Sequence, residues 1–341
     1  MKKAVVLGGT HDHISLIQTL KQKGFNTILV DYLDAPPAAE IADKHIKEST
    51  VDKETVLQIA KNENASLVIS TCIDSALSTV AYVSEKLFLP CHVPYSTALS
   101  LTNKSLMKEI FIKNGIPTSR YYVLNNKNCD SCNDLLFPLV VKPVDANSSK
   151  GVTKVLNRKD LHNAVETAFK FTLSGKVIIE EFKEGIELSV DALVVNGEAH
   201  LVMISENIKS AVNRGNFTIV KNRCPAEISS ADESAILEIA GKISEAYNIK
   251  NAPLLIQLIY NNGNISVIEF SSRIGGGSKL HFIRRMKGFD LLDAFVDQIL
   301  GNEIEFAADN QANFGQMCYL YANPGIIDSY CGFEMLKKTG V

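Results

Sequence analysis

Short apolar runs alternate with amphipathic stretches over the first ninety residues. The runs KAVVLGG (3–9), NTILVDY (26–32) and SLVIS (66–70) are rich in β-branched residues, as buried strands are. Helical stretches follow them, near 14–24, from about Asp52, and then up to Leu87. This alternation predicts a parallel, doubly wound α/β unit over 1–94.

The pattern changes to mixed α+β after Pro94. In TNKSLMKEIFIKNGIP, the apolar residues Leu106, Ile110 and Phe111 predict a helix, which Gly115 and Pro117 would end. Strands are predicted at FPLVVKP, KVIIEEF and ELSVDALVV, helices from about Arg158 to Leu173 and from about Ser230 to Tyr247, and a hairpin at LLIQLIYNNGNISVIEFSSR.

Composition narrows the class of protein. The chain has 341 residues, 46% of them hydrophobic, which is enough for more than one packed core. A net charge of −3 gives no global basic field for nucleic acid or an anionic membrane. The apolar run at the N-terminus is too short for a secretion signal, and no stretch has the length of a membrane span, so we expect a cytoplasmic protein. Seven cysteines, an odd number, favour reduced thiols, with the lone Cys129-Cys132 pair incidental.

The first strand ends in a turn that invites a nicotinamide-binding interpretation. Gly8 and Gly9 follow the strand, and Asp31 ends the second strand, where a ribose acceptor would lie. However, GGTHDH lacks the later glycines that allow close pyrophosphate approach. A nicotinamide oxidoreductase is therefore disfavoured.

Two segments carry candidate nucleotide chemistry. Lys142 ends an apolar strand next to the small-residue loop DANSSKG, an arrangement suited to holding phosphate, although such a loop is also an ordinary surface turn. In VIIEEF, a strand leaves the core at Glu180, and Glu187 follows seven residues later. Backbone groups there can bind adenine and the downstream carboxylate a ribose, but each glutamate alone is also typical of a solvated strand end.

The end of the hairpin, EFSSR, has the pattern of a ligand-binding site. Side-chain alternation places Glu269, Ser271 and Arg273 on one face, with Ile268 and Phe270 on the other, toward an apolar layer. A partly buried carboxylate and arginine on one strand face require pairing or bound ions.

Strand register sharpens this interpretation. Gln257 lies opposite Glu269 if the turn is a three-residue loop, Asn262-Gly263-Asn264, whereas a two-residue turn would pair Gln257 with Ile268. We predict the three-residue loop. Gln257 and Glu269 would then offer hard oxygen ligands to a magnesium ion that carries nucleotide phosphates.

The order of these motifs resembles the ATP-grasp superfamily. The order runs from Lys104 through Lys142 with SSKG and the segment from EEF to GIE to Gln257 with EFSSRIGGG. The nearest likeness is to the carbamoyl phosphate synthetase large-chain-like and amino-acid ligase branch. The resemblance implies an N-terminal doubly wound domain (1–94) and an α+β ATP-grasp domain (95–305), whose lid subdomain (about 118–182) and core subdomain (183–305) clasp ATP. A C-terminal segment (306–341) follows.

The resemblance also implies roles for individual residues. Lys104 and Lys142 would contact ATP phosphates under a flexible loop of Ser148, Ser149, Lys150 and Gly151. Adenine would bind at a hinge of Glu180, Glu181, Phe182 and Lys183, and the ribose at Glu187. Gln257 and Glu269 would bind Mg²⁺ (or Mn²⁺), with Ser271 as a third and weaker contact, because the family motif usually has Asn there. Arg273, with Lys142 and Ser271, would act on the transferring phosphoryl group.

The implied activity is that of an ATP-dependent carboxylate-amine ligase, which forms an acyl phosphate and releases ADP and phosphate. The alternative is an ATP-binding module without turnover. The partners would be a small-molecule carboxylate and an amine, and a homodimer is possible. Candidate substrate contacts are Arg214, Gly276, His281 and Arg284, because guanidinium groups match planar oxyanions.

Overall fold

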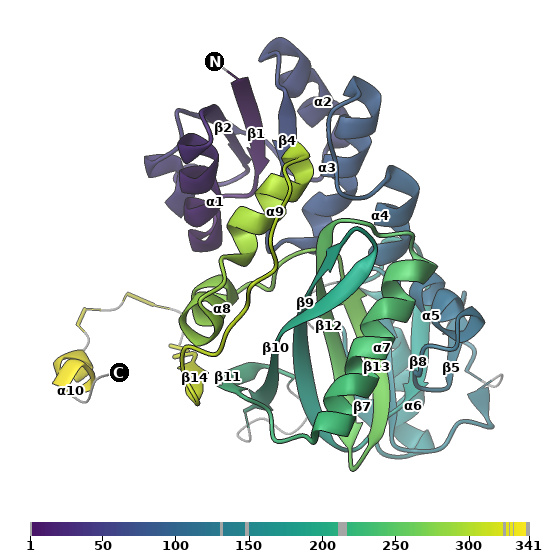
Figure 1. Ribbon diagram of the computed structural model, residues 1–341. Coiled ribbons are helices and arrows are strands. Elements are labelled where there is room, and N and C mark those ends of the chain that lie inside the picture. The colour runs from purple at the N-terminus through teal and green to yellow at the C-terminus, as the bar shows by residue number, and fades with distance from the viewer. Residues whose placement is uncertain are drawn as a thin grey trace.

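The computed structural model describes residues 2–129, 132–146, 150–210, 217–322, 325–326, 328–329 and 331–338. Within these residues, three sheets organise the fold (Figure 1): a four-stranded sheet of order β3-β2-β1-β4, a six-stranded sheet of order β13-β12-β9-β10-β11-β14, and a four-stranded sheet of order β5-β8-β6-β7. The predicted fold class, a doubly wound α/β unit followed by α+β structure, is confirmed. Within the described residues, no helix combines the length and the apolarity needed to cross a membrane.

The N-terminal unit is parallel and covered on both faces. Its strands are β1 (Lys2–Leu7), β2 (Phe25–Asp31), β3 (Lys44–Lys47) and β4 (Leu67–Ile69), and its helices are α1 (His11–Gln22), η1 (Pro37–Glu40), α2 (Lys53–Asn62) and α3 (Asp74–Leu87). Alternate residues of β1 point to opposite sides. Val6 packs with Leu16 of α1, whereas Val5 packs with Val56 of α2 and Val80 of α3. This explains why β1, β2 and β4 are predominantly apolar runs. The edge strand β3, with the sequence KHIK, is not.

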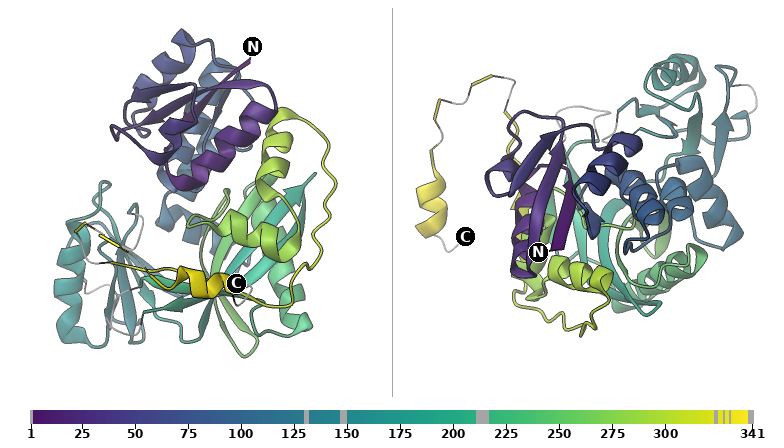
Figure 2. Two further views of the ribbon diagram at one scale, coloured as in Figure 1. Left: turned by 90° about the vertical axis from the view of Figure 1, so that its left-hand side faces the viewer. Right: turned by 90° about the horizontal axis from the view of Figure 1, so that it is seen from above.

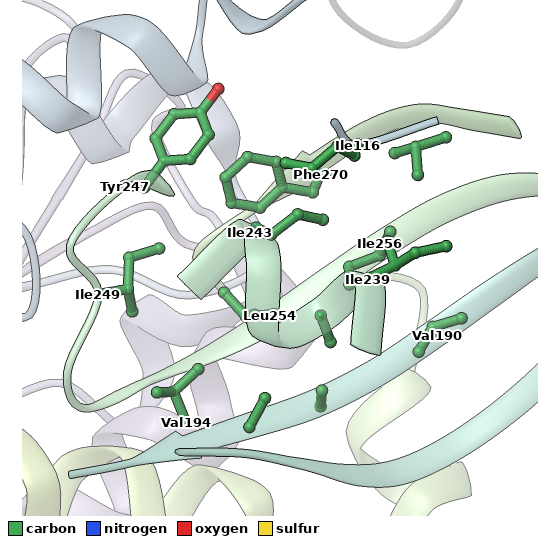
Figure 3. Packing of buried hydrophobic residues seen from close by; sticks show 14 of the residues in the cluster. Ile116, Val190, Val194, Ile239, Ile243, Tyr247, Ile249, Leu254, Ile256 and Phe270 are labelled. Carbon is green, nitrogen blue, oxygen red and sulfur yellow. The ribbon is translucent and has the colours of Figure 1, made fainter. Parts of the chain in front are cut away.

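The six-stranded sheet is antiparallel and forms the largest body. It comprises β9 (Ile186–Val195), β10 (Glu198–Lys209), β11 (Ile219–Cys224), β12 (Ala252–Asn261), β13 (Asn264–Ser271) and β14 (Gly315–Cys318). Helix α7 (Ser230–Ala246) starts at a capping box of Ser229 and Asp232 and covers one face. Figure 3 shows its residues Ile239 and Ile243 packed over Val190, Leu254 and Ile256.

The other face of this sheet is divided between packing and a site. Helices α8 (Lys279–Lys287) and α9 (Leu291–Leu300) cover one end, where Leu193 and Met203 join their core. They also lie against the N-terminal unit, as Figures 1 and 2 show for α9 beside α1. The rest of the face, beginning at Ser189 and Glu187, lines open pockets.

The third sheet forms a lobe of its own (Figure 2). Its strands are β5 (Tyr121–Leu124), β6 (Leu139–Pro143), β7 (Thr153–Val155) and β8 (Val177–Glu181), and they are covered by α6 (Arg158–Phe169). Helices α4 (Tyr95–Leu101) and α5 (Lys104–Lys113) connect it to the N-terminal unit, and α10 (Phe333–Lys338) stands apart from the sheets. Helix α6 ends before the predicted Leu173, because Asp145 accepts hydrogen bonds from Thr172 and from the Leu173 and Ser174 N–H groups.

The hairpin of β12 and β13 corrects one prediction and confirms another. Asn261 pairs with Asn264, and Asn262 and Gly263 both have positive φ, so the turn has two residues and the predicted three-residue loop is wrong. Gln257 nevertheless lies opposite Glu269, as predicted, because the pairing shifts at a β-bulge: Leu258 pairs with Val267.

The bulge also moves one side chain. Ile268 lines the cleft beside Glu269 and does not face the apolar layer, so its predicted orientation is wrong. Val267 takes the buried position instead and packs in the core with Phe270, whose inward orientation is as predicted. The extra residue therefore sends two consecutive side chains, Ile268 and Glu269, toward the cleft.

Candidate functional site

A cleft opens between the four-stranded lobe and the free part of the six-stranded sheet. Strands β6 and β8 supply one wall, and β9, β10, β12 and β13 supply the other. The predicted residues that line it are Lys104, Lys142, Glu180, Glu181, Phe182, Lys183, Glu187, Gln257 and Glu269. The structure thus brings together residues that lie 165 positions apart, from 104 to 269, in one concave site.

A buried charge cluster lies at the junction of the two walls. Lys142 Nζ, at the end of β6, lies 2.7 Å from Glu180 Oε1, and Lys108 Nζ lies 3.0 Å from Glu180 Oε2. Burial opposes ionisation of Glu180, but these two ammonium groups lower its pKa to about 2. Glu180 therefore stays ionised and fixes the Lys142 side chain.

Lys104 links this region to the hairpin. Its Nζ donates to the Ala146 carbonyl at 2.9 Å and lies 3.5 Å from Glu269 Oε2. Its backbone N–H donates to the Val144 carbonyl, so the start of α5 is bound to the segment that follows β6. Asn103 caps this helix by accepting from the Ser105 and Leu106 N–H groups.

The segment predicted to bind adenine, Glu180 to Lys183, lies where β8 ends, and two of its backbone N–H groups already donate hydrogen bonds within the protein. Glu181 N–H donates to the Arg120 carbonyl, and Phe182 N–H donates to the Pro138 carbonyl. The Glu181 carboxylate accepts from Arg120 and from the Leu136 N–H. Because its carboxylate is bound by these groups, Glu181 would contact a ligand in the cleft through its backbone.

Polar residues continue along the cleft face of β9 and β10. Glu187 accepts from Asn207 Nδ2 at 2.9 Å and lies 2.5 Å from Lys209 Nζ. Glu187, Ser189 and Asp191 alternate with Leu188 and Val190, which are fully buried in the core. Strict alternation of this kind marks a sheet with one polar face, and it was the available signal for Ser189 and Asp191, which sequence reasoning missed.

The hairpin side of the cleft presents oxygen ligands. The Glu269 side chain is 37% exposed, and Gln257 lies opposite it on the neighbouring strand. Ser271, two residues farther along, is largely buried and hydrogen-bonds to Asp74 of the N-terminal unit. Within the described part of the chain, no group of three or more His, Cys, Asp and Glu side chains gathers as a metal site. A metal at this position would use one carboxylate and an amide oxygen.

Arg273 is also held by Asp74. Its Nε lies 2.7 Å from Asp74 Oδ1, and its Nη2 lies 2.5 Å from Asp74 Oδ2. Burial opposes ionisation of Asp74, but Arg273 and the bond from Ser271 keep the pKa of Asp74 below its usual value. Both members of the pair are therefore charged.

A second pocket adjoins the cleft and shares Gln257 with it. Its described lining includes Ser189, Asn207, Asn222, Arg273, Gly276, Lys279, Tyr319 and Tyr321. Lys279, which is only 3% exposed, donates to Ser189, Ser205 and Asn222 and lies 3.2 Å from Asp191 Oδ2. Tyr319 and Tyr321 follow β14 and donate to the Gly277 and Ile219 carbonyls.

Several predicted residues lie elsewhere. Ser148, Ser149 and Arg214 lie outside the described residues. Lys150 is exposed, Gly151 has a φ of +71° beside Phe171, and neither lines the cleft. His281 and Arg284 lie on the exposed side of α8, where Arg284 pairs with Asp290, and the pockets described above do not include them. Their roles stay predictions.

Lys108 and Asp74 were missed for different reasons. Lys108 lies on the same side of α5 as Met107 and Phe111. In the sequence it therefore interrupts an apolar helical stripe with a charge. A lysine in such a stripe is itself a signal of a buried ion pair. Asp74 had no comparable signal, because its partner lies 199 positions away.

Comparison with known proteins adds independent evidence. The sequence profile described as "ATP-grasp domain" matches residues 135–280. Multifunctional protein ura1 of Schizosaccharomyces pombe is 26% identical over 309 residues, which cover 86% of this chain and 13% of that protein. Phosphoribosylamine–glycine ligase of Lactococcus lactis is 26% identical over 268 residues, which cover 75% of this chain and 64% of that protein. The chain thus spans less than two thirds of either relative.

A solved structure shares the fold. N5-carboxyaminoimidazole synthetase from Staphylococcus aureus complexed with ADP superposes with a TM-score of 0.79 at 16% identity, covering 94% of this chain and 82% of that chain. The profile match spans Lys142, Glu180 and Gln257, three of the residues on which the resemblance was based. The chain therefore contains an ATP-grasp domain, as the order of its motifs predicted.

Proposed function

We propose that this protein is an ATP-dependent carboxylate-amine ligase that acts through an acyl phosphate. The observation that carries the proposal is that Gln257 and Glu269 face each other in the cleft, with Lys104 within 3.5 Å of Glu269. Oxygen ligands beside a lysine suit a metal–polyphosphate complex. The relatives named above include a ligase and a structure complexed with ADP, which supports the same assignment.

The nucleotide would lie along the cleft with its base in the apolar part. Val140, Val152 and Ile268 line that part and suit a flat aromatic ring. Since the N–H groups of Glu181 and Phe182 are used within the fold, we expect Lys183 N–H and the Glu181 carbonyl to bind the base edge. Glu187 would accept from the ribose hydroxyls, and Lys104 and Lys142 would contact the phosphates.

The residues present fit a magnesium ion. Mg²⁺ prefers one or two protein oxygens together with phosphate and water oxygens, and Gln257 and Glu269 supply such a pair. When bound, the ion neutralises negative charge on the phosphates. Ser271 is engaged by Asp74, so we assign the metal to Gln257 and Glu269.

The second pocket would hold the acid and the amine. A carboxylate oxygen of the acid forms a bond to the terminal phosphorus while the bond from that phosphorus to the bridging oxygen of ADP breaks. The amine nitrogen then forms a bond to the acyl carbon, phosphate leaves, and the nitrogen loses a proton. Arg273 and Lys142 stabilise the negative charge on the transferring group, because fixed positive charge acts strongly in a site that excludes water.

The test is phosphate release from Mg-ATP over a panel of amino acids and small carboxylates. We expect release that requires one acid and one amine, and a loss of at least about 100-fold in Glu269→Ala. Glu227→Ala is the matched control, because its side chain is 81% exposed and outside the cleft lining. ATP binding without substrate-dependent release would support a binding module, and equal rates in wild type and Glu269→Ala would refute the assigned site.

A further inference from the structure

The segment that follows β13, residues 272–278, is bound to the N-terminal unit. We call it the glycine loop, since Gly275, Gly276 and Gly277 form its centre. It lies against residues that follow β1 and β4, at the carboxyl edge of the parallel sheet. In open α/β sheets that edge is where ligands bind. Here it is occupied by a part of the chain itself.

Three contacts hold the backbone of the glycine loop. The Asp12 carboxylate accepts from the Gly277 N–H at 3.2 Å and the Ser278 N–H at 3.1 Å. Cys72 Sγ donates to the Gly275 carbonyl at 3.4 Å. His92 Nε2 lies 2.9 Å from the Ser272 carbonyl, and its half-buried ring packs edge-on against Phe295.

The fourth contact differs, because it holds a side chain of the proposed chemistry. Asp74, the first residue of α3, binds Arg273 through both carboxylate oxygens, and Arg273 Nη1 donates to the Ile274 carbonyl at 3.0 Å. Asp74 lines the nucleotide cleft, and Arg273 lines the second pocket. The pair therefore spans the boundary between the nucleotide cleft and the second pocket.

We propose that Asp74 is a positioning residue that fixes the Arg273 guanidinium at this boundary. A two-point carboxylate contact fixes the plane of a guanidinium group, and the N–H groups not used by Asp74 and Ile274 can then point at a transferring phosphoryl group. Asp74 itself adds negative charge beside the phosphates, so attraction to the nucleotide does not explain its presence. This proposal rests on the proposed function for its kinetic consequence, but not for its geometry.

Asp74→Asn separates positioning from charge. Removing the carboxylate leaves Arg273 with an uncompensated positive charge, so affinity for Mg-ATP should not fall, while the orientation of the guanidinium is lost. We expect kcat to fall about tenfold or more with the KM for ATP no higher than in wild type, as for the loss of an interaction made in the transition state. Asp74→Glu keeps the charge and should recover part of kcat.

Two controls make the result specific. Asp12→Asn weakens the hold on the glycine loop without touching Arg273, so its loss of kcat should be smaller. Asp52→Asn replaces the N-cap of another helix in the same unit with a good capping residue and should leave kcat unchanged. A kcat for Asp74→Asn within about twofold of wild type, or an equal loss in Asp12→Asn, would overturn the proposal.

A readout without turnover distinguishes failure of this proposal from failure of the proposed function. The Nε–H resonance of Arg273, assigned by its absence in Arg273→Lys, should exchange slowly with water in wild type and Asp12→Asn, and broaden in Asp74→Asn. If wild type shows the protected resonance but no substrate supports ATP turnover, the ligase assignment fails and the positioning stands. If wild type lacks a protected resonance, the positioning is wrong whatever the activity.

Discussion

Buried charges are the most informative residues of this site. Glu180 is 5% exposed and Lys108 is 1% exposed, and each is tolerated because the other neutralises it. Lys142 is bound by the same carboxylate. A lysine that contacts phosphate must be held without being neutralised completely, and a carboxylate shared between two lysines satisfies both conditions.

Because Lys108 and Lys142 share the Glu180 carboxylate, substitutions at Lys108 and at Glu180 should have coupled effects on the free energy of unfolding. Lys108→Met should lower the free energy of unfolding by about 3 kcal/mol, because it removes one partner of a buried ion pair. Adding Glu180→Gln should lower the free energy of unfolding further, because the buried Lys142 then loses the carboxylate that it shares with Lys108. Urea unfolding of the single and double variants checks this, and a double variant more stable than Lys108→Met would contradict it.

The lowered pKa of His92 leads us to expect that the free energy of unfolding depends on pH. Burial lowers the pKa of His92 from 6.5 to about 4, so the native state keeps the ring neutral while the unfolded chain takes up a proton below pH 6.5. Its contribution to stability is complete above pH 6.5 and is lost as the pH falls toward 4. Between pH 7 and pH 5 wild type should lose about 2 kcal/mol through this group.

His92→Gln is the test of that dependence. Glutamine can donate to the Ser272 carbonyl but does not titrate, so the variant should show a correspondingly flatter loss of stability between pH 7 and pH 5. His13, whose pKa burial also lowers to about 4, contributes equally in both proteins. Denaturant unfolding at several pH values provides the measurement, and parallel curves for the two proteins would refute the assignment.

At the residue scale, the sequence predicted the parts of the site that lie at strand ends. Lys142 and Glu269 stand where an apolar run stops, and Glu187 stands where one begins. The chain order links them to a known family. Asp74 and Lys279 could not be found in this way, because their partners are distant in sequence and their roles depend on packing. Sequence patterns report periodicity within an element, not which elements meet.

At the scale of elements, the hairpin shows how local rules can give a correct pairing for a wrong reason. The Asn-Gly turn has the two-residue form that its sequence favours. The pairing of Gln257 with Glu269 depends instead on an extra residue, Ile268, within the strand. A bulge leaves no strong signature in sequence, so a three-residue turn is the register that the sequence alone offers for pairing Gln257 with Glu269.

Deleting Ile268 tests this account of the hairpin. Removal of the bulged residue leaves an uninterrupted ladder that still pairs Gln257 with Glu269. We expect a cooperatively folded protein within about 1 kcal/mol of wild type, since Ile268 is only partly buried. Affinity for MgADP should fall, because a wall of the cleft is lost, and loss of cooperative unfolding would contradict the account.

At the scale of the whole molecule, the C-terminal segment completes the second pocket. Strand β14 adds to the edge of the six-stranded sheet at β11, and Tyr319 and Tyr321 then form a wall. A chain ended after Phe314 should keep its affinity for MgADP, because the nucleotide cleft does not include this segment. The KM for the acid should rise about tenfold or more, as for lost ground-state binding.

Tyr319→Phe is the conservative companion to that truncation. It removes only the hydrogen bond to the Gly277 carbonyl and should raise the KM for the acid by a smaller factor, with the fold intact. Steady-state kinetics with the acid identified from the panel gives both numbers. An unchanged KM in the truncated chain would place the acid elsewhere.

The N-terminal unit binds the glycine loop in the way that a receptor binds a ligand, although both belong to the same chain. Such an intramolecular ligand competes at a high effective concentration, commonly in the millimolar range for flexible tethers. A dinucleotide that approached this sheet edge would have to displace it from Asp12, Cys72 and Asp74 together. The missing glycine fingerprint after β1 and the occupied edge are therefore two aspects of one specialisation: the nucleotide-binding edge of an α/β fold has become a docking surface for its own chain.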